Sequence, residues 1–135
     1  EEVLYETYAK TINIEALTMI DMASKQIIPA VIKYTKSLAD TVIAVKEAGA
    51  DASVQADLLK QVTEKLNGMK AALAKLEEVT AKASSMNHAK EQAFYYKDVV
   101  KEAMEELRIP ADEAEMLVDK KVWPIPTYGD LIFEV

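Results

Sequence analysis

The sequence predicts an all-α fold, an elongated antiparallel bundle of three to four long helices followed by an extended tail rich in proline and aromatic residues. Apolar residues recur at alternating spacings of three and four over most of the chain, the period of a helix that buries one side. Short polar breaks separate these stretches, and short connections force antiparallel neighbours. The single Trp, two of the four Pro and one of the three Gly then fall within residues 123–129. We therefore expect a helical bundle over residues 1–122 and an extended tail over residues 123–135.

The first helix is expected at about residues 2–48. Its second half carries one apolar stripe, made of Ile27, Val31, Tyr34, Leu38, Thr41, Val45 and Ala48. Gly49 follows where a helix commonly ends on glycine. Pro29 removes one backbone hydrogen bond and predicts a disturbance near Lys25, either a kink in one helix or a break between two.

A second helix is expected at residues 52–83, with Asp51 as its N-cap. Its stripe keeps strict three-four alternation through Leu59, Val62, Leu66, Met69, Leu73, Leu76, Thr80 and Ala83. The phase survives Asn67-Gly68, so this pair is interpreted as a weak point inside one helix, because a loop would normally reset the phase.

A third helix is expected at residues 87–108, with the stripe Ala89, Ala93, Tyr96, Val100, Ala103 and Leu107. Pro110 is predicted to end it and to begin a short fourth helix at residues 111–120. The second and third helices are expected to form the bundle with the second half of the first helix.

Residues 14–28 are apolar over well over half of the helix circumference, which is too wide for a helix with one wet face. Such a helix needs partners on more than one side. The candidate docking residues on this segment are Ile14, Leu17, Met19, Ile20 and Met22.

The tail supplies three further docking candidates, Trp123, Tyr128 and Phe133. Residues 123–126 predict a preset extended strip, residues 127–130 a turn, and residues 131–135 a short strand or extended end. The composition allows the strip to lie in a groove of a larger body or to fold back over the chain's own bundle.

Composition limits the classes of protein. With 135 residues, one hydrophobic core is expected. The net charge of −7, most of it in the last third, disfavours nucleic acid or an anionic membrane as the main partner. The sequence has no apolar run of the length of a membrane span, and it has no Cys, so a cytoplasmic protein without disulfides is expected.

The residues offer little catalytic chemistry. One His and no Cys cannot build a zinc site, and three separated Gly cannot build a phosphate-binding loop. His88 is expected to be exposed or to cap a helix. The acidic cluster Asp112, Glu113, Glu115 and Asp119 is a weak candidate for a hard cation, because helix-dipole complementation already explains its first two members. We expect no catalytic, cofactor-binding or metal-binding residue in this chain.

Three stretches carry a resemblance to a known family. They are Thr11–Ile20 (TINIEALTMI), Ile27–Ile32 (IIPAVI) and above all Leu117–Val135 (LVDKKVWPIPTYGDLIFEV). They resemble the carboxy-terminal region of group III glutamine synthetases, the large bacterial form. The family often has an aromatic residue where this chain has Val122 and Ile125.

The resemblance implies an ATP-dependent ligase that condenses glutamate and ammonia with Mg or Mn, in a dodecamer of two stacked hexameric rings. It also implies that the catalytic residues lie in upstream domains, because none of the family's metal, ATP or glutamate motifs matches a position here. The expectation is a non-catalytic helical domain that packs against the rest of the synthetase chain and neighbouring subunits. The alternative is an independent helical-bundle module that binds another protein.

Overall fold

The structure, a computed structural model, describes residues 2–126, and within them it confirms the all-α prediction, since no strand occurs. The tail beyond Pro126, with the predicted turn and terminal strand, lies outside the described residues. No helix in the described part combines the length and apolar character that a membrane span needs. The elements are α1 Glu2–Met22, the π-helical turn η1 Ala23–Ile27, α2 Ile28–Glu47, α3 Ser53–Ser84, α4 Ala89–Tyr95, the π-helical turn η2 Tyr96–Val100 and α5 Lys101–Leu117.

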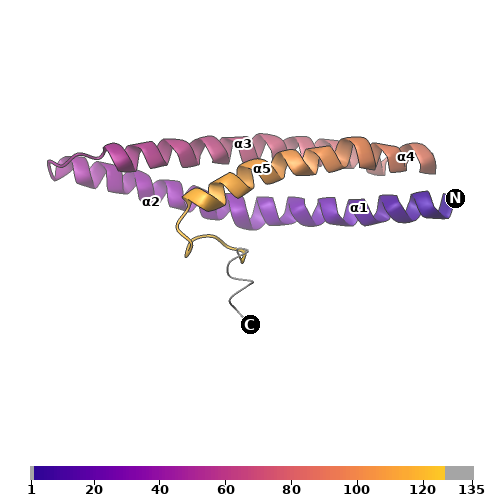
Figure 1. The fold of residues 1–135 in the computed structure, drawn as a ribbon, viewed down its shortest axis with the longest axis horizontal. Coiled ribbons are helices and arrows are strands. Elements are labelled where there is room, and N and C mark those ends of the chain that lie inside the picture. Colours follow the sequence, from indigo (N-terminus) through magenta and orange to yellow (C-terminus); the bar gives the residue numbers. More distant parts are fainter. Residues whose placement is uncertain (1, 127–135) are drawn as a thin grey trace.

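These elements form three helical rods that lie along one another (Figure 1). The first rod is α1, η1 and α2, the second is α3, and the third is α4, η2 and α5. The chain reverses direction after α2 at Gly49, which has a φ of 83° in the left-handed region. It reverses again between α3 and α4, so the first and third rods run in the same direction and α3 runs against both.

The third rod lies beside α1, which differs from the expected arrangement. It packs on α1 through α4 and η2 and on α3 through α5, while α2 packs mainly on α3 (Figure 1). The third rod ends at Leu117, too early to follow α2 to the turn at Gly49. The last part of the predicted first stripe is therefore not core: Thr41 and Ala48 are exposed and Val45 is half-buried.

The stripes of the second and third rods match their predicted burial closely. In α3, Val62, Met69, Leu73 and Leu76 are 0–1% exposed, and the helix is unbroken through Asn67-Gly68. The helix begins one residue later than predicted. Ala52 occupies the N-cap position, and the carboxylate of Asp51 accepts the backbone N–H of Ser53 at 3.0 Å. The hydroxyl of Ser53 also donates to this carboxylate, and this hydrogen bond, together with the backbone one, lowers the pKa of Asp51 because both stabilise the charged form.

Pro29 does not separate two helices, because helical backbone continues through η1 into α2. Proline lacks the N–H that would bond the carbonyl four residues earlier. The disturbance falls on the five residues before Ile28, where the Ile28 N–H bonds the carbonyl of Ala23, five residues back. A π-helical turn of this kind accommodates one extra residue without ending the helix.

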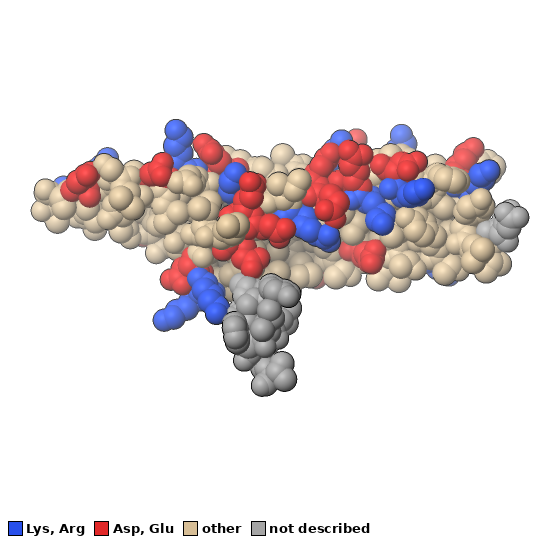
Figure 2. All heavy atoms as spheres, viewed as in Figure 1, with Lys and Arg blue, Asp and Glu red and all other residues tan. Residues whose placement is uncertain are grey.

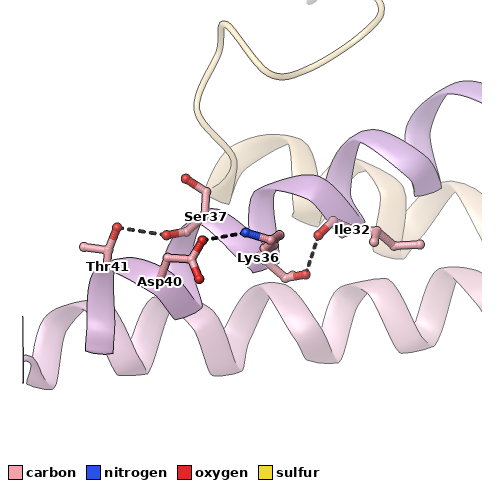
Figure 3. A network of polar contacts seen from close by, with 6 residues as sticks. Ile32, Lys36, Ser37, Asp40 and Thr41 are labelled. Carbon is pink, nitrogen blue, oxygen red and sulfur yellow. Dashed lines mark hydrogen bonds and ion pairs between the residues drawn. The ribbon is translucent and has the colours of Figure 1, made fainter. Parts of the chain in front are cut away.

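The outer surface of α2 satisfies its polar groups within the helix (Figure 3). The ammonium of Lys36 lies 2.8 Å from the carboxylate of Asp40, and the hydroxyl of Thr41 donates to the carbonyl of Ser37 at 2.8 Å. Pairs four residues apart face each other on a helix and contribute a few tenths of a kcal/mol each. These polar side chains are therefore satisfied within α2 itself.

The prediction that Pro110 ends the third helix was wrong, because α5 runs through Pro110 to Leu117. Proline in a helix interior costs about 3 kcal/mol. Leu107 before it and Ala114 after it are 2% and 0% exposed, and burial of one leucine alone returns about 1.5–3 kcal/mol. Packing on both sides of the proline outweighs the local preference. The proposed helix at 111–120 is thus the end of α5, so its acidic residues do not complement a helix start.

Replacing Pro110 by Ala is expected to raise the free energy of unfolding by about 1–3 kcal/mol, because the new N–H restores a bond to the carbonyl of Glu106. Urea unfolding followed by circular dichroism measures the change. Ile109→Ala, at a neighbouring site that is 59% exposed, is the control and should change stability by less than about 0.5 kcal/mol. A Pro110→Ala variant less stable than the original chain would show that contacts of the proline ring hold α5 in place.

Tyr96 joins the third rod to the first. Its ring is 2% exposed, and its hydroxyl lies 3.0 Å from the side-chain oxygen of Asn13. Burial raises the pKa of Tyr96 above its ordinary value of 10.0, because the phenolate would lose its hydration.

Stability is therefore expected to fall as the pH rises through 10, since the unfolded chain releases the Tyr96 proton before the folded chain does. Tyr96→Phe should remove this part of the pH dependence and cost about 1 kcal/mol at pH 7 through the lost hydrogen bond. Urea unfolding at pH 7 and above pH 10 tests both effects. Tyr95→Phe, which removes the hydroxyl of the neighbouring, half-buried tyrosine, is the control for the loss of stability at pH 7. An unchanged pH profile in Tyr96→Phe would contradict the assignment.

Candidate functional site

The five docking candidates on α1 divide into two groups. Ile14 is 65% exposed and Leu17 is 51% exposed, so both present apolar side chains to the outside. Met19, Ile20 and Met22 are half-buried, and Met19 and Ile20 pack against the core. The wide apolar coverage predicted for this segment is thus present, and only part of it is used by this chain.

The core-facing side of α1 and η1 consists largely of small residues, which were not predicted to form the buried stripe. Ala9, Ile12, Ala16 and Ala23 are all at most 5% exposed. Their spacing of three, four and seven continues into Ile27 and was a readable signal. The pattern is hard to recognise because the larger apolar residues Ile14 and Leu17 lie between these positions and predict a different buried side. Small side chains let α1 approach the third rod closely, which leaves the larger ones outside.

A groove of about 660 Å³ lies between the first rod and α5, and we call it the α1–α5 groove. Its lining includes these apolar residues from α1, η1, α5 and the chain that follows α5: Met19, Met22, Ile27, Met104, Leu107 and Trp123. Methionine side chains are flexible and polarisable, and they adapt to different apolar partners. The groove is therefore suited to an apolar segment.

Local structure after α5 positions Trp123 in this groove. Asp119 accepts the backbone N–H of Lys121 on its carboxylate and that of Val122 on its carbonyl, both at 2.9 Å, and so forms a tight turn. The turn brings Trp123 back onto the helices, where it is 7% exposed and belongs to the core. Its indole Nε1 has no hydrogen-bond partner among the described residues.

The other two tail candidates, Tyr128 and Phe133, lie outside the described residues. The docking role of Trp123 stays a prediction, and within the described residues its ring packs on the chain's own helices. Of the two placements that the sequence allowed for the tail, the start of the tail follows the second.

Acidic side chains gather over the middle of α5, next to the groove (Figure 2). The rim of the groove carries Glu15, Asp112, Glu105 and Glu115 against two cations, Lys101 and Arg108. The guanidinium of Arg108 lies 2.7 Å from the carboxylate of Glu105, so these two charges largely cancel. The remaining rim is acidic.

The predicted acidic cluster does not form a metal site. Glu113 points toward α3 and pairs with Lys65 at 3.5 Å, while Asp119 serves the turn before Trp123. Within residues 2–126, no three acidic or histidine side chains come close enough together to hold a metal ion. This acidic cluster therefore does not fit the divalent cations that the resemblance implies for the whole enzyme. His88 is exposed at the N-cap position of α4, and its side chain makes no capping bond.

Comparisons with known proteins confirm the resemblance. Residues 1–46 match the family described as the glutamine synthetase C-terminal domain. The whole chain is similar to the carboxy-terminal part of proteins named glutamine synthetase. It is 38% identical to the one from Butyrivibrio fibrisolvens over 99% of this chain and 27% identical to the one from Bacteroides fragilis over 98%. It is 28% identical, over 98% of this chain, to a type-3 glutamine synthetase from Dictyostelium discoideum.

The chain spans about a fifth of the length of these curated relatives, 19% in each case. Most of each relative therefore has no counterpart in the 135 residues.

Truncating Trp123 to Ala is expected to lower the free energy of unfolding of the chain by about 3–5 kcal/mol, because a large buried ring is removed. Trp123→Phe should cost much less, since no hydrogen bond of the described residues is lost. Urea unfolding measures both, and Pro124→Ala, at an exposed position, is the control. Acrylamide should quench the fluorescence of the single Trp several-fold less in the folded chain than in the chain unfolded in urea. Equal quenching in both states would place the ring outside the core.

Proposed function

We propose that this chain, whose sequence matches the carboxy-terminal domain of glutamine synthetases, is the helical carboxy-terminal domain of a type-3 synthetase and packs subunits in its oligomer. The observation that carries the proposal is the similarity over 99% of the chain to a protein five times longer. A relative named type-3 supports the group. Two relatives are bacterial and one is from Dictyostelium, so a bacterial source is part of the proposal.

The packing role is supported by apolar surface that the chain does not bury. Ile14 and Leu17 are more than half exposed on α1, and the α1–α5 groove beside them is lined by methionines and other apolar residues. Exposed apolar surface of this kind, next to a groove, is typical of surfaces that contact another protein. Neighbouring subunits and the rest of the synthetase chain are the partners that the proposal names, with a homododecamer as the assembly.

In this proposal the whole enzyme ligates ammonia to glutamate with ATP and Mg or Mn, in the cytoplasm, and the chemistry takes place in the part of the protein that precedes these residues. The inventory of side chains supports that division. The chain has one His, which is exposed, and one Arg, which is paired with Glu105. The 135 residues alone are proposed to be inactive.

An independent helical module that binds another protein remains the rival function, because the exposed Ile14 and Leu17 suit it equally well. The two functions differ in the size of the native protein. Only a domain of a synthetase must be part of a much longer chain.

The size of the native protein in its source cells is expected to be about five times that of the 135-residue chain, given the 19% coverage. An antibody raised against the chain measures it on a denaturing gel. The band should co-purify with glutamine formation that depends on ATP and glutamate. A band at the size of the chain itself, without such activity, would favour the independent module.

The packing role has its own test in the same protein. A synthetase that lacks residues 1–135 is expected to sediment as species smaller than the complete oligomer, because the surfaces of this domain are gone. An oligomer of unchanged subunit number would contradict the packing role and leave the family assignment intact.

A further inference from the structure

We propose that the α1–α5 groove is filled, in the complete protein, by an apolar segment with basic flanking residues that comes from the part of the synthetase preceding this domain. The inference rests on the proposed function, and it names the partner surface that the proposed function leaves open.

The shape and chemistry of the groove indicate an apolar occupant. The groove has a volume of about 660 Å³, enough for several side chains of a peptide segment. Met19 and Met22 on one wall and Met104 on the other are side chains that adapt to an inserted partner. Ile14, 65% exposed, extends the apolar surface beyond the rim.

The charge of the rim indicates which flanking residues the occupant carries. Glu15 and Asp112 are exposed and make no ion pair within the described part of the chain. Arg108 is already neutralised by Glu105 at 2.7 Å. Lys101 is the other cation of the lining, against the two carboxylates of Glu15 and Asp112, so the groove attracts Lys or Arg side chains.

The same charges disfavour the chain's own last residues as the occupant. Ile125 lines the groove, so the sequence that follows it begins close by. Residues 127–135 include Asp130 and Glu134 and no Lys or Arg. They would bring two negative charges to an acidic rim. The four-fifths of the relatives' length that lies outside this region is the larger source of segments with the required chemistry.

A photo-crosslinking amino acid at Thr18 in the complete protein identifies the occupant. Thr18 is exposed and lines the groove, so the substitution leaves the core intact. After irradiation and proteolysis, mass spectrometry is expected to find a cross-link to an apolar segment with flanking Lys or Arg from the preceding part of the synthetase. A cross-link to residues 127–135, to another copy of this domain, or to no peptide would overturn the inference.

Charge reversal tests the electrostatic part. The double variant Glu15→Lys and Asp112→Lys is expected to reduce the Thr18 cross-link yield about threefold or more, because each exposed charge pair contributes up to about 1 kcal/mol. Glu77→Lys with Glu78→Lys, an exposed acidic pair on α3 outside the groove, changes the net charge equally and should leave the yield unchanged. Circular dichroism of both variants checks the fold.

The outcomes separate this inference from the proposed function. A protein of 135 residues in the source cells would remove both. A full-length synthetase whose oligomer needs this domain, but whose groove cross-links to residues 127–135 or to nothing, would keep the proposed function and remove the groove assignment. An equal loss of yield in the Glu77 and Glu78 control would remove the role of the rim charges.

Discussion

The apolar stripe of α3 is the interaction on which the rest of the structure depends. Near the turn at Gly49, α3 contacts α2, and further along it contacts α1 and the third rod. It is therefore the helix that both other rods share. Its buried residues follow one stripe from Val62 to Ala83, and the half-buried Leu66 fills the step of seven between Val62 and Met69. A helix with this period presents a continuous seam, and two rods can pack along it without a change of phase. The positions of α1 and α5 relative to each other, and thus the groove between them, follow from the contacts of both with α3 together with the direct packing of α4 and η2 on α1.

The sequence pattern predicted the regular part of the fold well and failed where several forces compete. The stripes of α3 and of the third rod could be predicted because burial follows the helical period there, with Leu59, Leu66 and Ala89 half-buried and the other stripe positions buried. Pro110 was misjudged because its local preference is visible in the sequence, whereas the burial of Leu107 and Ala114 that overrides it depends on the tertiary structure. The pairing of the third rod with α1 could not be predicted either. It depends on where Leu117 ends α5, and on the small residues Ala9, Ala16 and Ala23, which permit close approach.

The candidate site was predicted in part for a related reason. An excess of apolar residues on α1 was readable, and the exposure of Ile14 and Leu17 agrees with it. The groove itself was not readable, because it forms only when the turn at Asp119 returns Trp123 to a place between α1 and α5. Residues almost a hundred positions apart meet there. The spacing of residues along one helix does not predict contacts between residues so far apart in the sequence. The identity of the tail residues predicts the family, but not the groove.

Beyond the end of α5, the bundle consists of α2 and α3 alone, and we call this part the two-helix arm. Its geometry determines how the length of the domain can vary among relatives. In that arm α2 packs mainly on α3, and the apolar pattern of both sequences repeats every seven residues, although Thr41 and Ala48 near the reversal at Gly49 are exposed. Seven residues inserted into each helix would keep every remaining side chain in phase and move only the turn outward. Evolution can therefore lengthen or shorten the arm in steps of one repeat, without disturbing the groove. An insertion of two or five residues in one helix alone would rotate the seam out of register.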